Sequence, residues 1–238
     1  MTALMFFGCS FLGFGPALAL FVLTVAPDAQ QVIVMITSSF FWLLALFLSS
    51  LFWIAVVPLK SYLVFGVTFS VLFQELFRLA FWKILKKAEE GLISITGSHS
   101  PLRKLRFHYV SGLGFGIMSG LFAMVNVMAD ITGPGTVGLY GDYKDFLVVT
   151  ALLTNCFVLL NTCWGILFYD GLEKRCWFRL TSVLLSHMLV SLLTVLNSRG
   201  LYLVPLLVNY GVLVVYLLWA LKVVGVSFAN VKKSVFPN

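Results

Sequence analysis

This sequence contains a serine and a histidine that could act as the nucleophile and the base of a serine hydrolase. Ser119 precedes Gly120, and His187 lies inside a strongly apolar stretch. A serine becomes a nucleophile when a base lies within hydrogen-bond reach and when nearby donors stabilise the developing oxyanion. Ser119 and His187 therefore allow one alternative, a serine protease-like enzyme that works inside a membrane. The position of Ser119 beside a glycine of a helix-packing pattern favours a structural role instead.

Two aspartates offer a second hydrolytic possibility. Asp142 follows Gly141, and Asp170 follows Tyr169, in dipeptides that could mimic an intramembrane aspartyl protease. Paired carboxylates must share one site if one of them is to hold a proton at neutral pH. The elements that carry the two aspartates therefore decide whether this chemistry is available.

The remaining polar residues and the cysteines point to structure rather than to reaction chemistry. Glu75 and Arg78 are three residues apart, so they can pair on one helix face, and we expect a structural ion pair near the cytosolic end of that helix. Ionisable groups in a membrane helix usually face protein or water. Asn161 and His187 are the other intramembrane polar candidates. The four cysteines form no metal-like cluster, so we expect no metal and no cofactor.

Gly112, Gly116 and Gly120 recur at every fourth residue. In a helix this spacing places them on nearly one face. Glycine is a poor helix former in water, but in lipid a row of small residues lets another helix come very close. The spacing therefore predicts tight helix packing at this face. The packed helix could belong to a partner or to the same chain, and the sequence leaves both possibilities open.

The composition assigns the chain to the membrane proteins. Of the 238 residues, 61% are hydrophobic and 11% are charged, with a mean hydropathy of +1.02. A soluble domain has about 25% charged residues. A net charge of +7 could indicate nucleic acid, but basic cytoplasmic loops explain it better in a membrane protein. We therefore expect a lipid bilayer as the environment and no nucleic-acid partner.

The sequence predicts an all-α polytopic protein, with residues 1–238 forming one domain. Apolar runs predict seven transmembrane helices, at residues 3–25, 32–57, 61–82, 107–131, 146–169, 180–197 and 201–226. Lysine and arginine concentrate at 83–106, at 170–179 and in the tail, so the N-terminus is predicted to be lumenal and the C-terminus cytosolic. By this topology Asp142 and Asp170 lie on opposite sides of the membrane, which argues against the aspartyl protease.

A receptor and a transporter are the remaining alternatives for a seven-helix chain. A receptor of the G-protein-coupled type would end its third span in an Asp-Arg-Tyr-like motif and carry Asn-Pro-x-x-Tyr in its seventh, and neither is present. A transporter would often contain an internal repeat with broken helices in corresponding halves. We find no such repeat, so neither class is favoured.

Several motifs, in order along the chain, resemble the anterior-pharynx-defective (Aph) family, a subunit of gamma-secretase. They extend from the first residues through the sixth predicted span. The matching segments are Phe6-Phe-Gly-Cys9, Phe11-Leu-Gly-Phe-Gly-Pro-Ala-Leu-Ala-Leu20, Gln74-Glu-Leu-Phe-Arg78, Lys86-Lys-Ala-Glu-Glu-Gly91, Tyr109 to Gly120, Gly133-Pro-Gly-Thr-Val-Gly138 and Trp164-Gly-Ile-Leu-Phe-Tyr-Asp170.

The resemblance implies a non-catalytic scaffold with seven spans, and not an enzyme. In that family the subunit assembles first with nicastrin and then holds presenilin, which supplies two catalytic aspartates. The small presenilin enhancer is a third partner. The resemblance also implies support for cleavage of type I membrane proteins such as Notch and amyloid precursor protein. The expected location is the endoplasmic reticulum, the Golgi, and the plasma membrane or endosomes.

The resemblance also implies roles for individual residues. Gly112, Gly116 and Gly120 match the family's triple-glycine motif, which is implicated in assembly. His187 matches the second of two intramembrane histidines, while the first falls on Asn161. Asparagine forms hydrogen bonds but takes up no proton near neutral pH. A metal pair or proton relay that needs both histidines is therefore not expected in this chain.

Overall fold

A computed structural model describes residues 3–56, 62–96, 101–132 and 143–225 of the protein, and the regular elements in these ranges are all helical. Seven of these helices are long and apolar enough to cross a membrane, which confirms the predicted all-α membrane fold. The elements are α1 (Ala3–Leu20), η1 (Phe21–Val25), α2 (Ala29–Ala55), α3 (Leu63–Thr96), α4 (Pro101–Thr132), α5 (Tyr143–Glu173), α6 (Trp177–Leu193), η3 (Thr194–Arg199) and α7 (Leu203–Val224).

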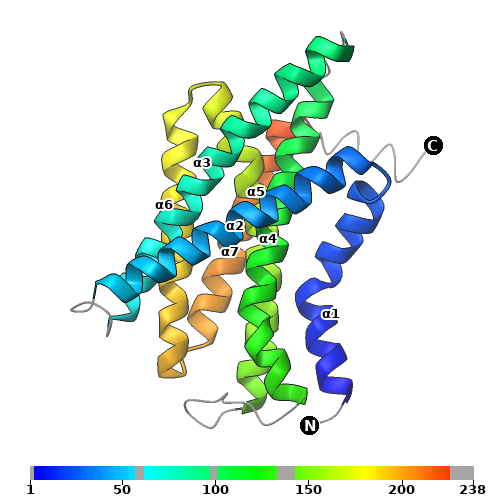
Figure 1. Ribbon diagram of the computed structural model, residues 1–238. Coiled ribbons are helices and arrows are strands. Elements are labelled where there is room, and N and C mark those ends of the chain that lie inside the picture. Colours follow the sequence, from blue (N-terminus) through cyan, green and yellow to red (C-terminus); the bar gives the residue numbers. More distant parts are fainter. Residues whose placement is uncertain (1–2, 57–61, 97–100, 133–142, 226–238) are drawn as a thin grey trace.

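Helices α4 and α5 form the centre of the bundle and are its most buried spans. Helix α5 contacts α1, α4, α6 and α7, and α4 also contacts α1 and α2. Helix α3 packs against α2 and α6. Figure 1 shows α2 crossing the bundle obliquely in front of α4, with α1 at its side. This arrangement makes α4 and α5 the elements that position most of the candidate residues.

The start of the first helix and the end of the last helix lie at opposite ends of the bundle. Helix α1 begins at the end where α4 finishes, and α7 finishes at the end where α4 begins (Figure 1). An odd number of spans requires such an arrangement. The lumenal position of the N-terminus stays a prediction. Asp142 and the C-terminal tail lie outside the described residues.

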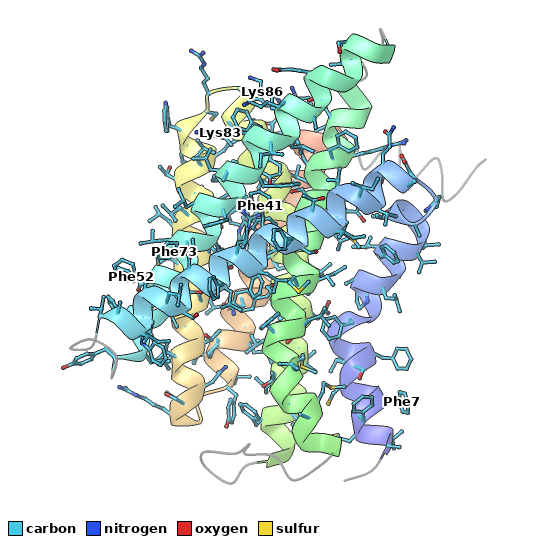
Figure 2. All side chains as sticks on the ribbon, in the orientation of Figure 1. Phe7, Phe41, Phe52, Phe73, Lys83 and Lys86 are labelled. Atoms are coloured by element: carbon cyan, nitrogen blue, oxygen red, sulfur yellow. The ribbon has the colours of Figure 1, made fainter. Side chains whose placement is uncertain are left out.

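Side chains on the outer surface are mainly apolar, as a lipid environment requires. Phe7 of α1 is 56% exposed and points away from the bundle in Figure 2. Helix α7 exposes a row of aliphatic side chains that includes Leu207 and Val214. In water, an apolar surface of this extent would indicate a partner or a membrane. Here the surface extends over several spanning helices, so lipid accounts for most of it.

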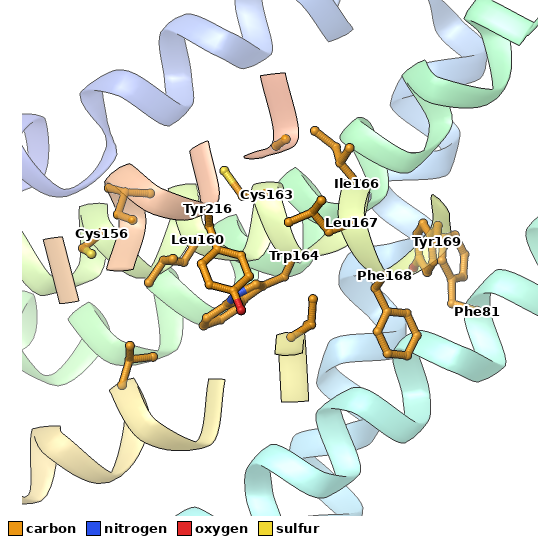
Figure 3. Close-up of a cluster of buried hydrophobic side chains, with 14 of the residues drawn as sticks. Phe81, Cys156, Leu160, Cys163, Trp164, Ile166, Leu167, Phe168, Tyr169 and Tyr216 are labelled. Carbon is orange, nitrogen blue, oxygen red and sulfur yellow. The ribbon is translucent and has the colours of Figure 1, made fainter. Parts of the chain in front are cut away.

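The largest cluster of buried apolar side chains follows α5 (Figure 3). Trp164 is at its centre, and the ring of Tyr216 from α7 meets it edge-on at 6.4 Å between centroids. Tyr169 and Phe81 extend the cluster toward α3. Lipid is as apolar as these side chains, so close packing and its dispersion energy hold the helices together, rather than exclusion from water.

Asp28 fixes the sharp connection between η1 and α2. Its carboxylate accepts a hydrogen bond from the Gln30 backbone N–H at 2.9 Å and one from the Gln31 side chain at 3.1 Å. Such a cap satisfies the free N–H groups at a helix start. The hydrogen bond from Gln31 lowers the pKa of the Asp28 carboxyl below its ordinary value. The first two spans are therefore joined by a short, hydrogen-bonded corner.

Helices α3 and α4 extend well beyond the apolar runs that predicted them. Helix α3 continues to Thr96, and α4 begins at Pro101. Residues 83–90 contain lysine, glutamate and alanine, which favour a helix whether or not lipid surrounds them. At 1.5 Å per residue, α3 is about 51 Å long, against about 30 Å of hydrocarbon. The two helices therefore project together beyond the bundle, as Figure 1 shows.

Candidate functional site

A buried polar cluster joins three helices near the middle of the bundle. Glu75 of α3 lies between two partners: its Oε2 is 3.1 Å from Arg78 Nε, and its Oε1 is 2.7 Å from His187 Nδ1 of α6. Arg78 is completely buried, and Glu75 and His187 are nearly so. The expected Glu75–Arg78 pair is therefore present. It lies midway along α3 rather than toward a cytosolic end, because α3 continues beyond the predicted span.

Asn161 of α5 completes the coordination of Arg78. Its side-chain oxygen accepts a hydrogen bond from one guanidinium nitrogen at 2.7 Å, and its backbone carbonyl accepts one from another at 3.3 Å. The Asn161 amide nitrogen donates to the Phe157 carbonyl at 3.0 Å. A buried charge needs both an opposite charge and further hydrogen bonds. For Arg78, Glu75 supplies the opposite charge and Asn161 supplies the further hydrogen bonds.

Aromatic rings enclose this cluster. The indole of Trp164 stacks on the imidazole of His187 with 4.4 Å between centroids. The Arg78 guanidinium lies 5.0 Å from the centroid of the Phe115 ring. Sequence reasoning missed Trp164, although it lies three residues after Asn161 and so shares its helix face. The carboxylate of Glu75 and the indole together hold the imidazole in one orientation.

Ser119 and His187 are not arranged as a nucleophile and its base. The Ser119 hydroxyl donates to the Gly116 carbonyl at 2.8 Å, and His187 Nδ1 is engaged by Glu75. No hydrogen bond connects Ser119 with His187 in the described part of the chain, although both line one cavity. A serine nucleophile requires its base within hydrogen-bond reach. The geometry therefore gives no support to the serine protease alternative.

Asp170 belongs to a cluster of ion pairs at the end of α5. Its carboxylate pairs with Lys174 at 2.7 Å and with Arg179. Nearby, Glu173 pairs with Lys104 Nζ at 2.8 Å and with His108 Nε2 at 3.2 Å. The other aspartate of the proposed protease pair, Asp142, is outside the described residues. Asp170 thus connects α5 with α6, and this is a structural role.

The three spaced glycines of α4 face α5 of the same chain. A Cβ atom added at Gly112 would lie 2.7 Å from the Asn161 carbonyl oxygen, and one at Gly116 would lie 2.5 Å from that of Val158. At Gly120 it would meet the Val158 side chain at 2.9 Å. Real Cβ atoms show almost no contacts under 3.0 Å. Only glycine therefore permits this approach, and the neighbouring helix is internal.

Two further glycines make the packing of α4 tighter. A Cβ atom at Gly165 of α5 would lie 2.6 Å from the Gly112 Cα, so the two glycines meet face to face. On another face of α4, a Cβ atom at Gly114 would lie 2.6 Å from the Met35 carbonyl oxygen of α2. Sequence reasoning assigned no packing role to Gly114. Helix α4 is consequently held between α2 and α5 by contacts close to its backbone.

The Asn161→His variant is expected to keep the stability of the unmodified protein, whereas Asn161→Leu is expected to lose it. A neutral imidazole places Nδ1 where the asparagine has Oδ1, so it can still accept from Arg78. Leucine leaves part of the guanidinium without an acceptor, which destabilises by about 1–3 kcal/mol. Thermal unfolding of the purified proteins measures the stability of each variant against that of the unmodified chain. Equal stability of the leucine and histidine variants would contradict the acceptor role.

The fold and site define a class: a polytopic helical membrane protein whose intramembrane polar groups pair with one another. No group of ligands suited to a metal ion occurs within the described ranges. The Aph-1 protein family model matches residues 4–227. The chain belongs to the Aph-1 family, as its motifs had indicated.

Individual relatives support this assignment over nearly the whole length. The chain is 47% identical over 241 residues to gamma-secretase subunit APH-1B of Mus musculus, covering 98% of this chain and 93% of the relative. It is 44% identical over 234 residues to gamma-secretase subunit Aph-1 of Drosophila melanogaster, covering 98% of each. It is 31% identical over 257 residues to gamma-secretase subunit aph-1 of Caenorhabditis elegans, covering 97% of this chain and 83% of the relative.

Proposed function

We propose that this chain is a scaffold subunit of gamma-secretase, a membrane-embedded protease complex. The observation that carries the proposal is the nearly full-length similarity to proteins named gamma-secretase subunits. The structure is consistent with a scaffold, because the candidate residues already pack against, or form hydrogen bonds with, other residues of the same chain. Glycine packing joins α4 to α5, and the polar cluster joins α3, α5 and α6. Such a bundle can present a preformed surface to its partners.

The proposed role is non-catalytic. Ser119, His187 and Asp170 each have a structural partner, and the first two share no hydrogen bond. Catalysis in the complex would then come from presenilin. We further propose nicastrin and the presenilin enhancer as companions, and Notch and amyloid precursor protein as substrates of the assembled protease. The endoplasmic reticulum, Golgi, plasma membrane and endosomes are the proposed locations.

An apolar groove offers one surface for a companion's transmembrane helix. It has a volume of about 940 Å³ and is lined mainly by α1, α4, α5 and α7. Its walls include Leu20, Ile166 and Leu217, and Asp28 and Arg106 lie at one end. In lipid, apolar helices associate when their surfaces fit closely. A groove walled by several helices gives an additional helix more contact than a flat surface does.

Purification in mild detergent tests the proposal, with Ser119→Ala compared with the unmodified chain. Both proteins are expected to retain the same companions, identified by mass spectrometry, and the same rate of substrate cleavage. Ser119→Ala removes a hydroxyl that donates to the Gly116 carbonyl at 2.8 Å and accepts a long hydrogen bond from the Asn161 amide at 3.4 Å. The rate is measured with a membrane-anchored fragment of a type I protein.

Two outcomes would contradict the proposal in different ways. Loss of cleavage by Ser119→Ala, with all companions present, would favour the serine protease alternative. A chain that purifies alone and binds a small ligand would exclude the scaffold role.

A further inference from the structure

The turn between α5 and α6 has an arginine where such turns usually have a glycine. The Cys176 backbone N–H donates to the Gly171 carbonyl at 2.8 Å, and the Arg175 N–H donates to the Leu172 carbonyl at 3.4 Å. This pair of hydrogen bonds ends many helices, and it places one residue in the left-handed conformation, usually glycine. Here that residue is Arg175, with a φ of 52°. In the part of the chain that the structure describes, it is the one residue other than glycine with a positive φ.

The conformation of Arg175 is strained, because its Cβ crowds the neighbouring backbone. Glycine adopts the same conformation without this strain, as Gly200 and Gly225 do at the ends of other helices. Strained residues occur where a ligand or a mechanism requires a particular side chain. The Arg175 side chain is exposed and forms no ion pair with the described residues. Stability of the fold alone therefore does not explain an arginine at this position.

Most basic side chains around this turn are neutralised by carboxylates. Those that pair with Asp170 or Glu173 are Lys174, Arg179 and Lys104. Lys86 of α3 differs from them: it is exposed, and no carboxylate of the described ranges pairs with it. Its Nζ lies 5.4 Å from the centroid of the Trp82 ring instead. Lys86 and Arg175 are therefore two cations available to an external anion.

Lys86 lies beside the turn. It follows Glu75 by eleven residues, or about three helical turns, so it is on the face of α3 that contacts His187 of α6. Lys86 is roughly 16 Å along α3 from that contact, and Trp177 is roughly 15 Å from it along the antiparallel α6. Lys86 also shares a small cavity with Glu173, the last residue of α5. Figure 2 shows Lys86 at this end of the bundle.

This level corresponds to the headgroups of a bilayer. The contact between Glu75 and His187 is near the middle of the bundle, and half of a hydrocarbon layer is about 15 Å thick. Trp177 and Phe178, which start α6, are 75% and 71% exposed. Exposed aromatic rings of this kind concentrate where hydrocarbon meets headgroups. The two cations are thus at the depth of lipid phosphates and next to rings that contact lipid.

We propose that Arg175 and Lys86 form a binding site for the headgroup of an anionic phospholipid, with Trp177 beside the upper part of its acyl chains. A guanidinium offers paired N–H donors that match a phosphate, and the lysine adds a second positive charge. The positive-inside rule predicts that this end faces the cytosol, where the leaflet contains anionic lipids. The exposed rings favour a lipid over an anion dissolved in water. This inference goes beyond the proposed scaffold role and does not depend on it.

Photo-cross-linking in lipid nanodiscs tests the site. The full chain, with any companions that it retains in mild detergent, is placed in phosphatidylcholine nanodiscs that contain increasing fractions of phosphatidylserine. One of the two lipids at a time carries a photoreactive acyl chain, and mass spectrometry measures the lipid attached to residues 175–178. At equal mole fraction we expect at least about fivefold more phosphatidylserine than phosphatidylcholine, the effect of one basic side chain at a membrane surface.

Arg175→Gly separates lipid binding from folding. Glycine relieves the strained conformation, so the unfolding temperature is expected to equal or exceed that of the unmodified protein. One cation is lost, so the phosphatidylserine fraction at half-maximal cross-linking is expected to rise about fivefold. Lys86→Gln is expected to cause a similar rise with no change in the unfolding temperature. A purely structural role for Arg175 would instead lower the unfolding temperature of Arg175→Gly and leave cross-linking unchanged.

Lys87→Gln is the matched control, because Lys87 is also exposed on α3 but points about 100° around the helix from Lys86. It is expected to leave the half-maximal fraction unchanged. An equal rise in Lys87→Gln would overturn the proposal, since overall charge would then explain the effect. Unchanged cross-linking in both Arg175→Gly and Lys86→Gln would overturn it as well. Loss of the phosphatidylserine signal in excess inorganic phosphate, at constant ionic strength, would show that a soluble anion is the occupant and would also overturn it.

Discussion

Gly116→Ala is expected to destabilise the bundle by about 1–3 kcal/mol, the usual effect of overpacking a tight interior. The added Cβ would lie 2.5 Å from the Val158 carbonyl oxygen and 3.0 Å from the Val158 Cα. Both atoms belong to backbone, so no side-chain rotation can relieve the contact, and α4 and α5 must move apart. Denaturation of the purified protein in detergent measures the loss.

Gly211→Ala on α7 is the matched control for this change. A Cβ atom at Gly211 meets nothing within 4 Å, so only the better helix propensity of alanine remains. Its stability is expected to equal or exceed that of the unmodified protein. If Gly116→Ala is as stable as Gly211→Ala, then the glycine face does not determine the α4–α5 distance. The larger Gly116→Leu change is expected to lower the yield of assembled complex, through loss of the bundle.

Arg78→Met is expected to destabilise the protein by about 3–5 kcal/mol, as when one member of a buried ion pair is removed. The change leaves the Glu75 carboxylate with only His187 as a polar partner, and it leaves the Asn161 side-chain oxygen without its donor. Both groups are buried, so only apolar side chains, including the new methionine, take the place of the lost partner. Thermal unfolding and the yield of intact protein from membranes measure the effect.

Lys83→Met serves as the control, because Lys83 is exposed on the same helix and the same charge is removed (Figure 2). It is expected to leave stability unchanged. Adding Glu75→Gln to Arg78→Met is expected to restore part of the loss, since the unpaired carboxylate disappears while a hydrogen-bonding group remains for His187. A double variant no better than Arg78→Met would show that the buried carboxylate is not the source of the destabilisation.

The seven helices could be predicted from the sequence because each must present a long apolar run to lipid, and such runs are visible without any tertiary contact. The projecting parts of α3 and α4 could not be located in this way. Hydropathy marks only the segment that crosses the membrane, whereas Lys86 and its neighbours remain helical for local reasons.

For packing, too, the sequence predicts contacts along one helix but not contacts between helices that are far apart in the chain. The spacing of Gly112, Gly116 and Gly120 predicts a close helix, and the pairing of Glu75 with Arg78 follows from their separation along one helix. The neighbours in space could not be predicted, since Asn161 is 83 residues from Arg78. The spacing of residues along a helix shows which face packs closely or carries paired polar groups, but it does not show which other helix lies against that face.

The position of Glu75 one helical turn before Arg78 has a consequence for biosynthesis. Helix α3 must enter the membrane before α5 and α6 exist, so Asn161 and His187 cannot yet help it. An arginine in the centre of an inserting helix is disfavoured by about 2.5–3.5 kcal/mol. With its counter-ion already on the same helix, α3 can be inserted as an electrically neutral segment. The later helices then need only to dock onto a pair that formed during translation.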